Sequence, residues 1–204
     1  MFTSTDVFLT LGRRGSGKSY LARRISEAYP RRVTFDLLDE HVDGDAVYTF
    51  DEFCEKIKGL ENASSFNVVF KFSPESVDFT HEFDHAMRVL WHKGNVCITI
   101  EEVQEFCSTH SMSHWLRQQL LTGRHRNNAL IFTTQRPGEC HKTIVSQASH
   151  VFAGSLHEKN DIDYVRSVLG EKAFELQKLP PREFLWFRPG ENIQKIDNNF
   201  NNKD

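Results

Sequence analysis

The fold of this chain is decided by the stretch Val7-Phe8-Leu9-Thr10-Leu11-Gly12-Arg13-Arg14-Gly15-Ser16-Gly17-Lys18-Ser19. The segment Val7–Leu11 is largely apolar and predicts a strand, and the run that follows it fits the pattern G-x-x-x-x-G-K-[ST] of a phosphate-binding loop. Glycines let backbone N–H groups turn inward around a phosphate, and a helix opening near Gly17 adds the positive end of its dipole. The stretch therefore predicts a binding site for a nucleoside triphosphate.

The same loop predicts which residues contact ATP. Lys18 is expected to reach the β- and γ-phosphates, and the Ser19 hydroxyl is expected to ligate Mg²⁺. The complete set of expected nucleotide contacts is Gly12, Arg13, Arg14, Gly15, Ser16, Gly17, Lys18, Ser19 and Tyr20.

Composition favours one soluble domain. The chain has 204 residues, of which 39% are hydrophobic and 26% charged, and no apolar run approaches the length of a membrane span. We expect one ATPase domain over residues 1–197 and a flexible, Asn-rich polar tail over residues 198–204. The N-terminus carries no readable secretory signal, so an intracellular location is expected.

Charge argues against a uniformly basic surface for nucleic acid. The net charge is −3 and the isoelectric point is about 6.4, so any contact with DNA must come from local patches. The candidate patches are Arg13-Arg14, Arg23-Arg24, Arg31-Arg32, Lys56 with Lys58, and the stretch from Arg117 to Arg126.

Cysteine usage predicts reduced thiols. Cys54, Cys97, Cys107 and Cys140 include no C-x-x-C pair, which argues against a disulfide framework or a zinc ribbon. Cys107, His110 and His114 have a spacing that could bring three metal ligands together, but a fourth ligand is missing, which favours a polar loop.

Short apolar strands alternate with helical patterns, which predicts an α/β fold with a mostly parallel central sheet flanked by helices. The expected strands are Val7–Leu11, Val33–Leu37, Asn67–Phe72, Val96–Ile100, Ala129–Thr134, Val151–Ser155 and Phe184–Phe187. The expected helices are Lys18–Ala28, Phe50–Gly59, Asp78–His92, Asp161–Leu169 and Glu171–Leu179.

The run Val96-Cys97-Ile98-Thr99-Ile100-Glu101-Glu102 brings two carboxylates to the carboxyl end of a strand, where ligands bind in open parallel sheets. This is the form of a Walker B element. Glu101 is expected to hold Mg²⁺, directly or through water, and Glu102 to orient and polarise the attacking water. The alternative is a charged helix start in which both side chains only favour the helix dipole.

Two further side chains are candidates for catalysis. Gln135 follows the strand Ala129–Thr134 and is placed to contact the γ-phosphate and the lytic water, although it could also be a loop residue. Arg124 lies well before that strand tip, poorly placed for its own nucleotide but suited to a neighbouring subunit's site. It is our candidate arginine finger acting in trans, with Arg126 as the reserve; a surface cluster or a DNA contact is the alternative.

Four motifs of this chain, taken in order, resemble the core motifs of the FtsK/HerA group of ring-forming, DNA-pumping ATPases. They are G-R-R-G-S-G-K-S, V-C-I-T-I-E-E, T-G-R and I-F-T-T-Q-R-P. The motifs span residues 12 to 137, and Val145–Val151 resembles the group's segment that leads into the next core strand. One departure is Glu101, where many relatives carry Asp. The longer side chain keeps the charge but shifts a metal or admits a water.

The resemblance implies a RecA-like P-loop NTPase fold and a motor without accessory domains, similar to the genome-packaging ATPases of membrane-containing icosahedral viruses. It implies a homo-oligomer, a hexameric ring, that threads double-stranded DNA into a preformed capsid. The implied partners are capsid or membrane-vertex proteins, and the implied locations are the host cytoplasm and the virion vertex. The segment Gln104–Arg117, directly after the paired carboxylates, is the expected DNA-gripping loop.

Two other functions fit the same sequence. Another motor of the same group, for plasmid transfer or phage export, carries the same motifs. A small-molecule or nucleoside kinase shares the loop, the size and the sheet. The paired Glu101 and Glu102 argue against a kinase, since such kinases carry an Arg-rich lid instead.

Overall fold

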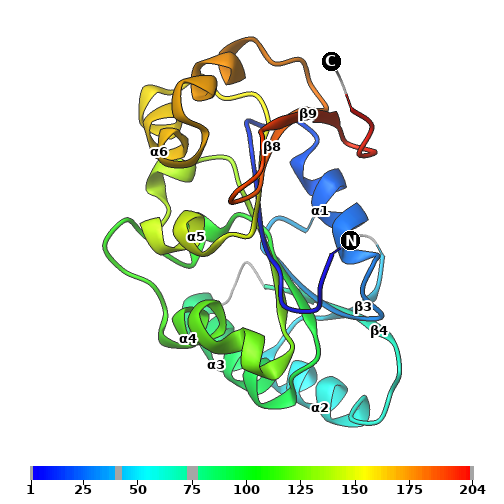
Figure 1. The fold of residues 1–204 in the computed structure, drawn as a ribbon. Coiled ribbons are helices and arrows are strands. Elements are labelled where there is room, and N and C mark those ends of the chain that lie inside the picture. The colour runs from blue at the N-terminus through cyan, green and yellow to red at the C-terminus, as the bar shows by residue number, and fades with distance from the viewer. Residues whose placement is uncertain (1, 40–42, 73–77, 203–204) are drawn as a thin grey trace.

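The computed structural model describes residues 2–39, 43–72 and 78–202. The strands within these ranges are β1 (Val7–Leu11), β2 (Arg31–Asp36), β3 (Asp45–Val47), β4 (Phe66–Lys71), β5 (Cys97–Ile100), β6 (Ala129–Thr134), β7 (His150–Ala153), β8 (Glu183–Phe187) and β9 (Gln194–Asp197). These described strands form one sheet in the order β3-β4-β2-β5-β6-β1-β7-β8-β9 (Figure 1). Strands β1 to β7 pair in parallel, and β8 and β9 continue the sheet antiparallel. The predicted mostly parallel sheet is confirmed.

The helices cover the two faces of this sheet unequally. They are α1 (Lys18–Ser26), α2 (Phe50–Gly59), α3 (Phe79–Lys93), α4 (His114–Thr122), α5 (Lys142–Gln147) and α6 (Lys159–Leu169). Leu21, Ala22 and Ile25 of α1 pack in one apolar cluster with Phe8 and Ile131. Buried residues of α2 to α6 belong to the other cluster, with the strand side chains that alternate to the opposite face. Among the described residues, no helix has both the length and the apolar character needed to span a bilayer.

The parallel register brings the functional loops to one edge of the sheet. β6 pairs with β1 on one side and with β5 on the other. The carboxyl ends of these three strands therefore lie next to one another, and each is followed by a predicted site segment: the phosphate loop, Glu101-Glu102 and Gln135. Because β6 lies between β1 and β5, Gln135 is positioned between the other two.

The structure differs from the sequence prediction mainly at short elements. The edge strands β3 and β9 and the helices α4 and α5 are absent from the predicted elements. The segment Glu171–Leu179, predicted as an α-helix, is instead the 3-10 helix η4 (Gly170–Lys178). Its buried residues are Ala173 and Leu176, and the buried Leu179 follows directly after it. This spacing of three matches the 3-10 repeat rather than the α-helical one.

The start of the predicted polar tail makes specific contacts. Asn198 donates a backbone hydrogen bond to the Arg182 carbonyl at 3.0 Å, and Asn202 forms a bridge to Ile196. The Phe200 ring lies edge-on to Phe152, with 5.9 Å between centroids. Residues 198–202 thus contact the end of the sheet that β8 and β9 form, while residues 203–204 lie outside the described residues.

Candidate functional site

The phosphate loop joins β1 to α1 in the expected strand–loop–helix arrangement. Gly17 precedes α1 with φ of 93°, a left-handed conformation that favours glycine. A Cβ atom on Gly12 would lie 2.7 Å from the Ser16 Oγ atom, so the loop packs too tightly there for a side chain. The first N–H groups of α1 have no intrahelical acceptor, which is the arrangement that binds phosphate oxygens.

Two features of the loop fit a polyphosphate. Within the described residues, the Ser16 hydroxyl is buried and has no hydrogen-bond partner. Arg13 and Arg14 are exposed, so both cations face the solvent side of the loop. Tyr20 is 40% exposed at the start of α1. The loop therefore supplies buried donors together with accessible positive charge.

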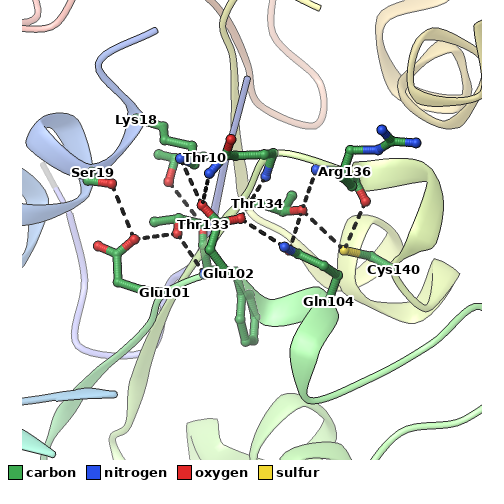
Figure 2. A network of polar contacts seen from close by, with 12 residues as sticks. Thr10, Lys18, Ser19, Glu101, Glu102, Gln104, Thr133, Thr134, Arg136 and Cys140 are labelled. Atoms are coloured by element: carbon green, nitrogen blue, oxygen red, sulfur yellow. Dashed lines mark hydrogen bonds and ion pairs between the residues drawn. The ribbon is translucent and has the colours of Figure 1, made fainter. Parts of the chain in front are cut away.

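Lys18 forms an ion pair with Glu102 across the site. The Lys18 Nζ atom lies 2.9 Å from the Glu102 Oε1 atom, and the two side chains are 7% and 5% exposed. Figure 2 shows Lys18 entering from α1 and Glu102 entering from the end of β5. A γ-phosphate would compete with Glu102 for the same ammonium group, so nucleotide binding and the freedom of the carboxylate are linked.

Amide groups fix the rest of the Glu102 carboxylate. Gln135 donates from its side chain to Oε1 at 2.8 Å and from its backbone N–H to Oε2 at 3.0 Å. Gln104 donates to Oε2 at 2.9 Å, and Gln104 in turn accepts from Thr134 at 2.7 Å. Glu102 has φ of 49°, an uncommon left-handed conformation for a residue other than glycine. The carboxylate is thereby held in one orientation at the tips of β5 and β6.

Glu101 points toward Ser19 instead. The Ser19 hydroxyl donates to Glu101 Oε2 at 3.3 Å, and the buried Thr133 hydroxyl donates to the same oxygen at 2.5 Å. Thr133 also accepts the Glu102 backbone N–H at 3.1 Å, so one hydroxyl positions both acidic residues. Hydroxyl and carboxylate oxygens are the ligands that Mg²⁺ prefers, and Ser19 and Glu101 therefore fit the predicted metal role.

Thr133 and Gln104 are site residues that the sequence reasoning did not single out. Thr133 is completely buried in β6. A polar residue in a strand that is buried along its whole length needs a hydrogen-bond partner, and this was the available signal. Gln104 carried no comparable signal, because its contacts depend on how the loop after Glu102 folds back toward β6.

The pKa of Glu102 lies below its usual value of 4.5. Burial raises the pKa of the carboxyl group. The nearby Lys18 ammonium and the hydrogen bonds from Lys18, Gln135 and Gln104 lower it, and their effect prevails. Glu102 is therefore a carboxylate at neutral pH, the form that a general base requires.

This pKa shift predicts how stability depends on pH. A carboxylate whose pKa is lower in the folded than in the unfolded protein stabilises the fold above about pH 4.5, and this contribution is lost as the pH falls through the folded pKa. In urea unfolding titrations, the stability difference between wild type and Glu102→Gln should therefore shrink below about pH 4.5. The exposed Glu55→Gln should match the wild type throughout. A Glu102→Gln difference that stays constant or grows in acid would contradict the prediction.

Arg124 lies at the opposite edge of the sheet from the phosphate loop. It belongs to η2 (Gly123–Arg126) before β6, and it lines a cavity of about 200 Å³ with Val7 and Leu130 at the amino ends of β1 and β6. Its side chain is exposed, and among the described residues it has no hydrogen-bond or ion-pair partner. It is therefore far from its own phosphate loop and free to contact another molecule.

Arg126, the reserve candidate, is occupied within the chain. Its guanidinium donates to the carbonyl oxygens of Trp91 at 2.9 Å and His92 at 2.6 Å, and it lies 4.9 Å from the centroid of the Trp91 ring. These contacts hold η2 against the end of α3 and leave Arg124 as the accessible arginine of the two.

The predicted DNA-gripping segment Gln104–Arg117 runs from the paired carboxylates Glu101 and Glu102 into α4. Its residues and the start of α3 line a cavity of about 640 Å³. Asp78, Asp84 and Glu105 give this cavity an acidic character, so phosphate contacts from this segment depend on exposed basic residues such as Arg117. The placement of a DNA-gripping loop here stays a prediction.

The side chains of Cys107, His110 and His114 do not come together as a metal site. Cys107 is buried and its thiol donates to the Val103 carbonyl at 3.3 Å, whereas His110 and His114 are exposed. In the described part of the chain, no three His, Cys, Asp or Glu residues lie close enough to hold a metal ion.

Several of the candidate DNA patches are paired within the chain. Arg23 contacts Asp43 at 3.2 Å, Arg24 contacts Glu27 at 2.8 Å, and Lys56 contacts Asp45 at 2.6 Å. Such surface pairs are weak, so a polyanion could compete for these cations.

Comparison with solved structures identifies the fold. The genome packaging NTPase B204 from Sulfolobus turreted icosahedral virus 2, solved in complex with ATP-gammaS, matches with a TM-score of 0.74 at 19% sequence identity, over 95% of this chain and 97% of that chain. B204, the DNA-packaging ATPase from Sulfolobus turreted icosahedral virus, matches with a TM-score of 0.71 at 20% identity, over 96% of this chain and 98% of that one.

A secretion ATPase shares the fold with lower structural similarity and lower sequence identity. Thermomonospora curvata EccC (ATPases 2 and 3) matches with a TM-score of 0.58 at 13% identity, and the match covers 98% of this chain but 37% of EccC. No protein-family model and no curated protein matches the sequence. At these identities the likeness shows the fold. It confirms the predicted P-loop NTPase architecture and, in fold, the resemblance to viral genome-packaging ATPases.

Proposed function

We propose that this chain is an ATP-driven translocase of double-stranded DNA that packages a viral genome into a preformed capsid. The observation that carries the proposal is the contact of Lys18, Glu102 and Gln135, with 2.9 and 2.8 Å from the acid to the other two side chains. A phosphate-binding cation, a carboxylate base and an orienting amide at one sheet edge are the groups that hydrolysis of a γ-phosphate requires.

The proposed roles of these residues are assigned from their positions. The loop from Gly12 to Ser19 binds the phosphates of ATP, and Lys18 neutralises charge on the β- and γ-phosphates. Glu102, released from Lys18 by the γ-phosphate, accepts a proton from the attacking water, and Gln135 orients that water. Ser19 and Glu101 would hold Mg²⁺, which supplies further neutralisation of phosphate charge.

The position of Arg124 supports the proposal that ATP is hydrolysed at subunit interfaces. It is exposed at the amino edge of the sheet, so it can complete a site only if that site belongs to another subunit. A guanidinium that reaches a neighbour's γ-phosphate stabilises the transition state and makes turnover depend on assembly. We propose a hexameric ring, because a closed ring gives every site one such neighbour.

The fold comparison favours packaging over other uses of the same motor. The two B204 structures match almost the whole of both chains, whereas EccC contains additional sequence. We accordingly propose residues 1–197 as one ATPase domain followed by the tail 198–204. The proposed partners are double-stranded DNA and capsid or vertex proteins, met in the host cytoplasm and at the virion vertex.

The proposal predicts ATP turnover that needs no added phosphate acceptor and that rises with duplex DNA. Phosphate release should be measured with and without duplex DNA over a salt series, together with the mass of the assembled particle. Contacts to DNA phosphates predict stimulation that falls as salt increases and that tolerates any DNA sequence.

Each other outcome points to a different function. Turnover that requires a small-molecule acceptor and ignores DNA would indicate a kinase. Turnover that another macromolecule stimulates and duplex DNA does not would indicate a motor that acts on a substrate other than duplex DNA. A monomeric particle at full activity would remove the role of Arg124 in trans.

A further inference from the structure

The phosphate loop has a second set of neighbours on the side away from the catalytic acids. Glu102 and Gln135 follow β5 and β6, on one side of β1, whereas β7, β8 and β9 continue the sheet on the other side. A triphosphate with its γ-phosphate between Lys18 and Glu102 must extend its α-phosphate and nucleoside away from those residues. The nucleoside therefore lies toward β7 and β8.

Arg182, just before β8, lies directly on this side of the loop. Its backbone N–H donates to the Ser16 carbonyl at 2.9 Å. A Cβ atom on Gly17 would lie 3.4 Å from the Arg182 Cγ atom and 3.7 Å from the Asn198 side-chain nitrogen. These contacts bring residues near the carboxyl end of the chain onto the loop that starts α1, as the nearness of β9 and α1 in Figure 1 also indicates.

Arg182 has two unusual properties. Its φ is 67°, in the left-handed region that a residue with a side chain rarely adopts. Its side chain is exposed, and within the described residues its guanidinium has no hydrogen-bond, ion-pair or ring partner. Residues with strained backbone conformations cluster at active sites and ligand-binding sites, and the unpaired guanidinium of Arg182 is available to a ligand of the adjacent loop.

Tyr20 and Asn199 close the same side. The Tyr20 hydroxyl donates to the Asn199 side-chain oxygen at 3.3 Å, and Asn198 is fixed by its backbone bond to Arg182. The segment after β9 is thereby joined to the first turn of α1. An exposed aromatic ring, an unpaired guanidinium and two amides surround the path that leads away from the phosphates.

We infer that Arg182, Tyr20 and Asn198 form the subsite for the nucleoside of the bound nucleotide, with the planar guanidinium of Arg182 packed against the base. The inference rests on the proposed nucleotide site. Stacking uses the face of the base, which every base has, so this contact adds affinity without selecting a base by itself.

The test compares nucleotides with a ligand that lacks the nucleoside. Dissociation constants of ATP, ADP and inorganic tripolyphosphate should be measured by calorimetry for the wild type and Arg182→Ala. Loss of a stacked cation should weaken ATP and ADP about 10-fold, equivalent to about 1.4 kcal/mol. The affinity for tripolyphosphate should stay unchanged.

Two further variants keep the test decisive. Arg182→Gly removes the same side chain and suits the left-handed backbone, so it should reproduce the loss even if Arg182→Ala folds poorly. Arg24→Ala removes an exposed cation of α1 that pairs with Glu27 and should leave all three affinities unchanged.

The outcomes separate this inference from the proposed function. Equal weakening of tripolyphosphate would mean that Arg182 binds phosphate, and unchanged affinity for ATP in both Arg182 variants would mean that it binds nothing; either result overturns the inference. Absence of ATP binding to the wild-type protein would instead refute the nucleotide site itself.

Discussion

Replacing Glu102 by glutamine should reduce ATP turnover about 10²–10⁴-fold while nucleotide affinity is kept. The amide cannot accept a proton from the attacking water. It can still accept a hydrogen bond from Lys18, so the site should remain folded. Because the charged competitor for Lys18 is lost, the dissociation constant of ATP should be equal to or lower than that of the wild type.

The measurement pairs steady-state phosphate release with equilibrium binding of ATP. Glu105→Gln is the matched control, because Glu105 is an exposed acid in the 3-10 segment that follows Glu102 and should turn over at the wild-type rate. Turnover within a few-fold of wild type in Glu102→Gln would assign the base elsewhere. A joint loss of turnover and binding would show that Glu102 mainly holds the loop in shape.

Replacing Arg124 by alanine should lower turnover about 10³–10⁵-fold in the assembled particle, the range typical of an arginine finger. The Arg124 side chain has no hydrogen-bond or ion-pair partner among the described residues, so its truncation should not disturb the subunit. Nucleotide affinity and particle mass should match the wild type. His125→Ala, the exposed neighbour in the same 3-10 turn, is the matched control and should retain activity.

A mixing experiment identifies the subunit on which Arg124 acts. Arg124→Ala subunits keep an intact phosphate loop, and Lys18→Ala subunits keep an intact Arg124. Each variant alone should be inactive, and their mixture should recover turnover at interfaces that combine the two intact parts. No recovery in co-assembled particles, with assembly verified by mass, would remove Arg124 from the finger role.

The parts of the site that the sequence predicted are those with local signals. Glycine spacing and the preceding apolar run located the phosphate loop after β1, and the apolar run before Glu101 located the acids after β5. Neighbouring strand tips in a parallel sheet then brought Gln135 toward them. Their catalytic roles stay predictions, whereas their placement at one edge is observed.

The parts that the sequence did not reveal depend on long-range register. Thr133 positions both acids only because β6 is paired with β5. Arg126 is tied to the carbonyl groups that end α3, a contact with no sequence pattern. The placement of Arg182 on the phosphate loop follows from where β8 joins the sheet. The segment after β9 was predicted from its composition as a flexible tail, and its contacts with the sheet have no sequence signal.

Helix α3 connects the two edges of the sheet that the proposed reaction uses. It is about 22 Å long, since its 15 residues each rise 1.5 Å. One end is joined to the Arg124 turn through Arg126, and the other packs Phe83 against Phe106, 4.0 Å between centroids, in the loop after Glu102. In a ring, α3 would transmit displacements between the two ends of the sheet. A neighbour's γ-phosphate that pulls on Arg124 would shift the loop beside Glu102, the proposed general base of this subunit. ATP hydrolysis would then proceed from one subunit to the next in order around the ring.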